Sequence, residues 1–306
     1  MKISNAKTGD IYALSNAILW SFFPILSALS LNSIGPFFSL ILSNTVSGAI
    51  LALIMWRKKL WNELLKKDQW KNLLYISLIL STAFYGLVFL GLQYTTSGNA
   101  GIILLMEILF SYFYFGLREK EKFNTVHILG SLLMIIGAIT ILFPGNIEVN
   151  KGDFLILIAT MIAPFGNAFQ KRARQSISST SIVFGRFTFS LPFLFILAFI
   201  FDPIPSLQNI QTSFFAILMN GIFVFALSKI LWVEAIHRIP VARSLSFETI
   251  SPPLTLLFGY FILSQTPTLW QILGVIPIII GTMCILKDTP TSQVPRVSEK
   301  PRHPQS

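Results

Sequence analysis

The sequence predicts an all-α integral membrane protein whose ten transmembrane helices form two inverted five-helix repeats. Three observations support this fold class. Apolar residues make up 53% of the chain and charged residues only 12%, about half the charged share of soluble domains. Apolar runs long enough to cross a bilayer recur throughout. A segment from the middle of the chain also returns near its C-terminus. A soluble fold could not bury so much apolar surface.

The apolar runs have the length that a membrane-spanning helix needs. About 20 residues, each rising about 1.5 Å, cross a hydrocarbon core of about 30 Å. Asp153 and Gln170 are expected at the interfaces, because the run between them is the shortest. No cleavage site follows the first run, which is also too long for a signal peptide, so we expect it to stay in the protein. The runs cover residues 11–30, 36–56, 72–93, 99–117, 126–143, 154–169, 181–201, 212–233, 244–263 and 269–286.

The internal repeat sets the predicted organisation. The segment HILGSLLMIIGAITIL at 127–142 returns 144 residues later as QILGVIPIIIGTMCIL at 271–286, with eight identical positions. Five spans in each half make the copies inverted, because an odd number of crossings brings the second copy in from the opposite face. Inverted repeats are typical of secondary transporters. The predicted domains are an N-terminus at 1–8, a first repeat at 9–143, an external linker at 144–151, a second repeat at 152–286 and a disordered tail at 287–306.

The basic residues predict the orientation. The net charge is +10, and 20 of the 23 lysines and arginines fall on one side if both termini are cytoplasmic. This distribution follows the positive-inside rule. We therefore expect a multi-pass protein of the cytoplasmic (inner) membrane whose partner is the lipid bilayer. A nucleic-acid partner is not expected.

The sequence contains no familiar catalytic signature. A His-Glu-x-x-His motif, a phosphate-binding glycine-lysine loop and a Gly-x-Ser-x-Gly elbow are all missing. The lone cysteine, Cys284, excludes an intrachain disulfide. His127, His237 and His303 are not expected to share one site. We therefore predict no catalytic residue, no metal and no cofactor, and the chain is not expected to be an enzyme.

Glu107 is the deepest charge that the predicted spans contain. It lies nine residues into the run 99–117, near the bilayer midplane, where an unpaired charge costs at least about 2.5 kcal/mol. One interpretation is a carboxylate that binds a substrate amine or carries a proton. The alternative is a glutamate that only fixes helix packing. Trp20 and Asn167 are further binding candidates, the first as a cavity aromatic and the second beside the helix breaker Pro164. Lipid-facing or core packing is the alternative for Trp20, and an ordinary helix kink is the alternative at Pro164 and Asn167.

Six further charges lie within or at the predicted ends of spans. Arg186 and Glu248 are candidates for a substrate contact or a gate, and a static bridge between them is the alternative. The other four are gate or charge-network candidates that could instead extend to water. All six are expected in the cytoplasmic third, where they could form one network. The four are Lys229, Glu234, Arg238 and Arg243.

Two pairs of glycines recur in the last span of each predicted half. Gly130 and Gly137 correspond to Gly274 and Gly281. Small residues two turns apart allow close contact between helices. They could pack the two halves together or form a homodimer, and both alternatives stay open.

Over about residues 9–286, the chain resembles the drug/metabolite transporter superfamily, with two EamA-type repeats. The similarity is carried by LQYTTSGNAGIILLMEILFSYFYFGLREKEKF (92–123) and AIHRIPVARSLSFETISPPLTLLFGYFILSQTPT (235–268). Family repeats have a Glu-Pro pair, then a glutamate thirteen residues later, then a glycine after nine more. The first half has Glu107-Ile108, Glu121 and Gly130, and the second has Ser251-Pro252, Gln265 and Gly274. The first half thus keeps both glutamates and the second keeps the proline.

The resemblance also covers single residues. Arg186 resembles an arginine common in the second span of such repeats, where the first half has Ser43 or Asn44, and Trp20 resembles a tryptophan of the first span. The resemblance implies transport of a small metabolite, such as an amino acid, a nucleoside or a related compound.

The sequence thus favours a secondary transporter that works by alternating access, with proton coupling as one mechanism. Two other functions stay as alternatives. A receptor or scaffold would not need helix-breaking prolines and a midplane glutamate. A lipid-modifying enzyme would need clustered His, Asp or Cys at one interface, which the sequence lacks.

Overall fold

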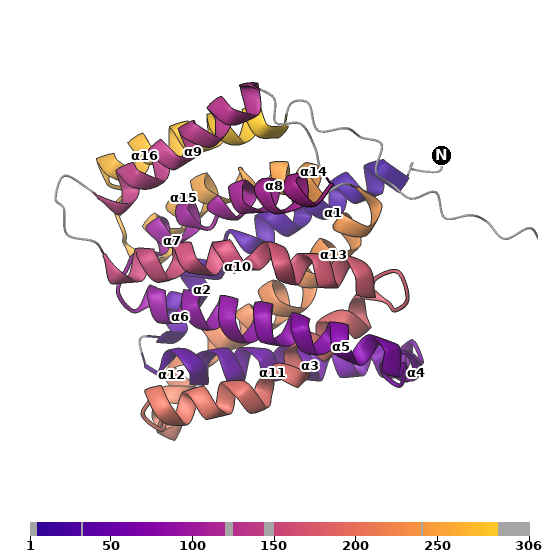
Figure 1. Ribbon diagram of the computed structural model, residues 1–306. Coiled ribbons are helices and arrows are strands. Elements are labelled where there is room, and N and C mark those ends of the chain that lie inside the picture. Colours follow the sequence, from indigo (N-terminus) through magenta and orange to yellow (C-terminus); the bar gives the residue numbers. More distant parts are fainter. Residues whose placement is uncertain (1–4, 32, 120–124, 144–149, 240, 287–306) are drawn as a thin grey trace, which may run out of the picture.

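The computed structural model describes residues 5–31, 33–119, 125–143, 150–239 and 241–286, and these residues form helices without any strand (Figure 1). The long helices run roughly along one direction, horizontal in Figure 1. α1 begins at the right of the view, near the marked N-terminus, and α10 begins at the left. Residues 1–4, Glu121, residues 144–149 of the predicted linker and the predicted tail at 287–306 lie outside the described residues.

The elements of the N-terminal part are α1 (Asn5–Trp20), α2 (Phe23–Leu31), α3 (Pro36–Arg57), α4 (Trp61–Leu64), α5 (Lys67–Ile76), the π-helical segment η1 (Ser77–Phe84), α6 (Tyr85–Leu92), α7 (Ser97–Ile103), α8 (Met106–Glu119) and α9 (Thr125–Leu142). Those of the C-terminal part are α10 (Lys151–Ala173), α11 (Ser179–Phe201), α12 (Leu207–Met219), the π-helical segment η2 (Asn220–Ser228), α13 (Lys229–Arg238), α14 (Val241–Glu248), α15 (Ser251–Leu263) and α16 (Leu269–Leu286).

Eight helical stretches of the described residues are long and apolar enough to cross a membrane. Each contains or overlaps one of the first eight predicted runs. The ninth run, 244–263, is divided between α14 and α15, and the tenth corresponds to α16, which is apolar over Leu269–Cys284. A count of ten spans therefore stays a prediction. The eight stretches are Ala6–Leu31, Pro36–Arg57, Lys67–Leu92, Ser97–Leu117, Thr125–Leu142, Lys151–Ala173, Ser179–Phe201 and Leu207–Arg238.

Several irregular elements recur at a constant spacing along the chain. The π-helical segments η1 and η2 begin at Ser77 and Asn220, 143 residues apart. α7 and α14 are both short helices that end at a break, and they begin at Ser97 and Val241, 144 residues apart. π-Helical turns often occur at functional sites. The recurrence is incomplete, because α1 and α2 are separated at Ser21 while α10 continues through Pro164.

α9 and α16 lie side by side along the upper edge of Figure 1, packed through glycines. A Cβ placed on Gly137 would lie 2.5 Å from the Gly274 carbonyl oxygen, and one on Gly281 would lie 2.4 Å from the Gly130 carbonyl oxygen. The backbones of the two helices thus approach more closely than any side chain allows. The glycine faces meet within one chain, as one of the two sequence interpretations predicts.

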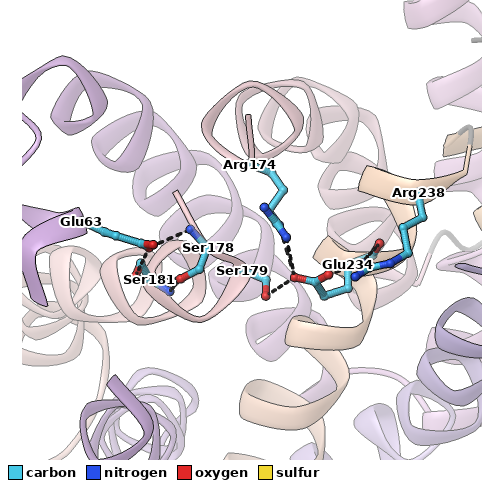
Figure 2. Close-up of polar contacts among 7 residues, drawn as sticks. All are labelled: Glu63, Arg174, Ser178, Ser179, Ser181, Glu234 and Arg238. Atoms are coloured by element: carbon cyan, nitrogen blue, oxygen red, sulfur yellow. Dashed lines mark hydrogen bonds and ion pairs between the residues drawn. The ribbon is translucent and has the colours of Figure 1, made fainter. Parts of the chain in front are cut away.

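The paired helices α3 and α11 each receive a carboxylate at their N-terminus. The Phe38 backbone N–H donates to Asp202 Oδ2 at 2.8 Å, and the Ser178 backbone N–H donates to Glu63 Oε2 at 2.7 Å (Figure 2). Negative charge is favourable at the start of a helix. Burial raises the pKa of Asp202 above its usual value, although the hydrogen bonds from the start of α3 oppose this.

Candidate functional site

A cavity lies between the helices, walled by residues from both parts of the chain. It encloses about 700 Å³ of empty space, including space that opens to solvent. Four charged side chains line it, two acidic and two basic, together with aromatic and amide side chains. The five predicted binding candidates all stand in its wall. The lining residues with functional groups are Asn16, Trp20, Tyr85, Glu107, Asn167, Arg186, Lys229, Trp232, Glu248, Ser251 and Thr255.

A chain of hydrogen bonds joins Glu107 to Arg186 across three helices. Asn167 Nδ2 donates to Glu107 Oε1 at 2.7 Å, and Gln170 Nε2 donates to Asn167 Oδ1 at 2.9 Å. Arg186 Nη1 then donates to Gln170 Oε1 at 3.4 Å, while its Nε donates to Ser81 Oγ at 2.9 Å. Among the described residues the Glu107 carboxylate and the Arg186 guanidinium form no ion pair with each other, so that each keeps capacity for a ligand.

Arg186 also lies over two aromatic rings. Its Cζ is 5.0 Å from the centre of the Tyr85 ring and 5.3 Å from that of Phe187. Arg186 is only 3% exposed. Stacking on aromatic faces is favourable for a desolvated guanidinium, and it fixes the position of this charge in the cavity wall.

Lys229 and Glu248 form the other charged part of the wall. Lys229 Nζ lies 3.3 Å from the centre of the Trp20 ring. Asn16 Nδ2 donates to Glu248 Oε1 at 2.5 Å, and Ser251 Oγ donates to Glu248 Oε2 at 3.2 Å. Among the ion pairs of the described residues, none joins two of the four cavity charges. The predicted alternative of a static Arg186–Glu248 bridge is therefore wrong.

Breaks in two helices bring the carboxyl groups to the cavity. Glu107 is the second residue of α8, directly after the break that ends α7 at Ile103. Glu248 is the last residue of α14, directly before the break that precedes α15. Irregular backbone at membrane depth is tolerated where it lines a cavity. Each carboxyl group thus lies at the break of one interrupted helix.

Glu234 and Arg238 do not line the cavity and belong to a separate cluster (Figure 2). Glu234 Oε1 accepts from Arg174 Nη2 at 3.0 Å and from Ser179 Oγ at 2.6 Å, and Glu234 Oε2 forms a close ion pair with Arg238. The cluster ties the end of α10 and the start of α11 to the end of α13.

Arg243 stands in a third place. It forms a two-pronged pair with Asp10, with Nε to Oδ1 and Nη2 to Oδ2 both at 2.8 Å. The six charges, which could have formed one network, therefore lie in three separate places among the described residues. Arg186, Lys229 and Glu248 face the cavity, Glu234 and Arg238 form the outer cluster, and Arg243 pairs with Asp10.

Sequence reasoning missed the neutral members of the site. Asn16, Ser81 and Gln170 hold the charged groups in place, yet each is a single polar residue in an apolar run, like many others in this chain. Arg174 and Asp10 were not predicted as site residues. A single sequence does not show which polar residue of one span contacts a charged residue of another span.

The wall chemistry suits a small organic molecule. Within the described residues, no group of three or more His, Cys, Asp or Glu side chains is arranged to hold a metal ion. The cavity instead offers two cations, two carboxyl groups, amides and indole rings. Such a mixture can bind a small molecule that carries charge of both signs and an apolar part.

Comparisons with known proteins identify a family and relatives of this chain. The model of the EamA-like transporter family matches residues 7–143 and again residues 150–287. The chain is similar to the uncharacterized transporter YoaV of Bacillus subtilis (strain 168), with 21% identity over 88% of this chain and 93% of that protein. It is also similar to the uncharacterized transporter YetK of the same organism, with 28% identity over 83% of this chain and 79% of the relative.

The fold is similar to that of a protein known from a crystal structure. The two superpose with a TM-score of 0.71 over 91% of this chain and 96% of that protein, at 15% sequence identity. At this identity the likeness concerns the fold alone.

Proposed function

Because the chain belongs to the EamA-like transporter family, we propose that it is a secondary transporter that moves a small organic metabolite across the cytoplasmic membrane. The observation that carries the proposal is the cavity. Its wall combines Glu107, Arg186, Lys229 and Glu248, of which Arg186 is 3%, Lys229 7% and Glu248 8% exposed. Charges inside a membrane protein are costly and mark substrate or ion pathways.

The balance of charge favours a zwitterionic cargo of amino-acid size. A carboxylate of the cargo would contact Lys229 or Arg186, and an amine would contact Glu107 or Glu248. The rings of Trp20 and Trp232, which also line the cavity, would cover an apolar side chain. A nucleoside fits less well, because it carries no charge that the two basic or the two acidic side chains could bind.

The architecture in this proposal consists of two inverted five-span halves, residues 9–143 and 152–286, that exchange access to the cavity. The recurring breaks and π-helical segments support it, and so does a family model that matches twice along the chain. Inverted repeats allow alternating access by the rocking of one half against the other. With the basic loops inside, both termini are cytoplasmic.

Uptake into proteoliposomes tests the function. The purified full chain is reconstituted, and the vesicles are preloaded with a mixture of unlabelled amino acids or, separately, of nucleosides. Exchange with the same radiolabelled mixture outside should occur for the amino acids. Lys229→Gln should lower its rate at least about tenfold, whereas Lys67→Gln, which changes an exposed lysine on α5, should leave the rate unchanged. Exchange of neither mixture above protein-free vesicles would count against the proposal, and exchange of nucleosides alone would refute the zwitterionic cargo.

A further inference from the structure

Two aspartates lie at opposite ends of the helix bundle and make equivalent contacts there. Asp10 lies in α1 and Asp153 lies in α10, and each stands three residues after the start of a family match, at 7 and at 150. α1 begins at the right of Figure 1 and α10 at the left. Each aspartate bonds to residues at the start of a short broken helix in the other part of the chain, α14 for Asp10 and α7 for Asp153.

The bonding partners correspond as well. Asp10 pairs with Arg243, and Asp153 Oδ2 accepts from Asn99 Nδ2 at 2.9 Å. Asn99 and Arg243 are 144 residues apart, close to the 143 residues that separate the two aspartates. Thr95 Oγ1 also donates a short hydrogen bond to Asp153 Oδ1. We call Asp10 with Arg243 the Asp10 latch, and Asp153 with Thr95 and Asn99 the Asp153 latch.

A glycine precedes each aspartate and lets the two parts of the chain approach closely. A Cβ on Gly9 would lie 2.8 Å from Ile239 Cγ2, and one on Gly152 would lie 2.4 Å from the Gly91 carbonyl oxygen and 3.0 Å from the Thr95 nitrogen. Ile239 and Thr95 are again 144 residues apart. Each latch is therefore part of a tight seam between the two parts of the chain, at one end of the bundle.

The two latches differ in chemistry. The Asp10 latch is a two-pronged ion pair whose side chains are 41% exposed for Arg243 and 23% for Asp10. Asp153 is 1% exposed, and the Thr95 hydroxyl and the Asn99 amide that bond to it are neutral. Gln271 Nε2 extends this latch by donating to Asn99 Oδ1 at 2.7 Å. Solvent screens the first contact, and burial protects the second.

Building on the proposed transport function, we propose that the Asp10 latch and the Asp153 latch are the paired locks of alternating access. Each holds its own end of the cavity shut, and the passage between the two access states breaks one latch while the other stays formed. The two contacts do not act on the cargo, because neither Asp10 nor Asp153 lines the cavity. They set the balance between the access states.

Labelling of a cavity cysteine from each side of the membrane tests the latches. The reporter is Ala163→Cys in a Cys284→Ser background, since Ala163 lines the cavity and Cys284 is the one native cysteine. The probe is the membrane-impermeant 2-(trimethylammonium)ethyl methanethiosulfonate, applied to right-side-out spheroplasts and to inverted vesicles. The measured quantity is the ratio of the labelling rate from the Asp10 side to that from the Asp153 side.

The expected shifts have opposite signs. Asp10→Asn should raise the ratio about fivefold, and Asp153→Asn should lower it about as much, because one hydrogen bond changes an equilibrium by roughly that factor. The exchange pair Asp10→Arg with Arg243→Asp should return the ratio toward that of the parent protein. Asp68→Asn, which alters an exposed aspartate in α5, is the matched control and should leave the ratio unchanged.

The outcomes separate the latches from the transport function. Unchanged ratios in both folded latch variants, or shifts of the same sign, would overturn the latch proposal. The transport function would still be supported if the reporter is labelled from both sides and exchange occurs in proteoliposomes. A reporter labelled from one side only in the parent protein, together with no exchange in proteoliposomes, would instead reject the transport function. Melting temperatures of all variants in detergent establish that each is folded.

Discussion

The ammonium group of Lys229 lies 3.3 Å from the centre of the Trp20 ring, inside a cavity that also contains two carboxyl groups. Both residues are thereby fixed: the ring faces the charge, and the charge stays within the cavity although no carboxylate forms an ion pair with it among the described residues. A desolvated cation over an indole ring is stabilised by about 2 kcal/mol.

Substitutions at this pair should separate charge from ring. Lys229→Gln should lower the rate of amino-acid exchange at least about tenfold, because it removes the charge for a cargo carboxylate and the cation–π contact. Trp20→Phe keeps a ring and should lose less activity than Trp20→Leu. Initial rates in proteoliposomes measure both effects. Equal rates for Trp20→Phe and Trp20→Leu would show that the ring does not hold the lysine for transport.

Glu107 should couple transport to protons. In the parent protein Asn167 Nδ2 lies 2.7 Å from Glu107 Oε1. Glu107→Gln keeps a side-chain oxygen that can accept this hydrogen bond, but it removes the titratable group. We expect folding and cargo binding to stay measurable, and the dependence of the exchange rate on pH to disappear. Proteoliposomes with an imposed pH difference give the measurement.

Glu248→Gln serves as the matched control for the second cavity carboxyl group. If Glu107→Gln keeps the full pH dependence while Glu248→Gln loses it, the proton is carried by Glu248. Unchanged pH dependence in both variants would remove proton coupling through the cavity carboxyl groups.

The sequence predicted the cavity charges better than their positions. Glu107 could be found because a carboxyl group in the middle of an apolar run is costly. Lys229 was expected near an interface, four residues before the end of the run 212–233. The helical stretch instead continues to Arg238, since Glu234 and Arg238 neutralise one another at its end. Nine residues of the stretch therefore follow Lys229, which lines the cavity, whereas Glu234 and Arg238 do not.

Other features of the fold depend on partners that a single sequence does not reveal. The run 244–263 was expected to be one span, but the backbone breaks between α14 and α15, where Glu248 bonds to Asn16 of a distant helix. Likewise, Asp153 was expected only at an interface, and Asp10 was not singled out. Only the contacts across the two parts of the chain show that they correspond.

Glu63 should make stability depend on pH. Partial burial raises the pKa of this carboxyl group, but the hydrogen bonds from Ser178 and Ser181 and the nearby charge of Lys66 together lower it by more. The pKa of Glu63 therefore lies below its usual value of 4.5. The contact therefore stabilises the folded protein fully above pH 4.5, and the stabilisation is lost as the pH falls through the lowered pKa. Glu63→Gln should lower the melting temperature in detergent at neutral pH.

The difference in melting temperature between Glu63→Gln and the parent protein should shrink toward zero as the pH is lowered below 4.5. Lys67→Gln, which removes an exposed charge that does not titrate near pH 4.5, is the control and should show no such convergence. A difference that stays constant over the whole pH range would mean that the charge of Glu63 does not stabilise the start of α11.

Close backbone contact between α9 and α16 predicts different effects for two glycine substitutions. A Cβ on Gly137 would lie 2.5 Å from the Gly274 carbonyl oxygen and 2.6 Å from Ile278 Cγ1, so Gly137→Ala must push the helices apart. Overpacking of this kind costs about 1–3 kcal/mol, and we expect a melting temperature in detergent several degrees lower.

A Cβ on Gly48, in α3, would have nothing within 4 Å of it. Gly48→Ala should therefore leave the melting temperature unchanged or raise it slightly, since alanine favours helix over glycine by about 1 kcal/mol. Equal losses at both positions would show that the α9–α16 contact does not limit stability.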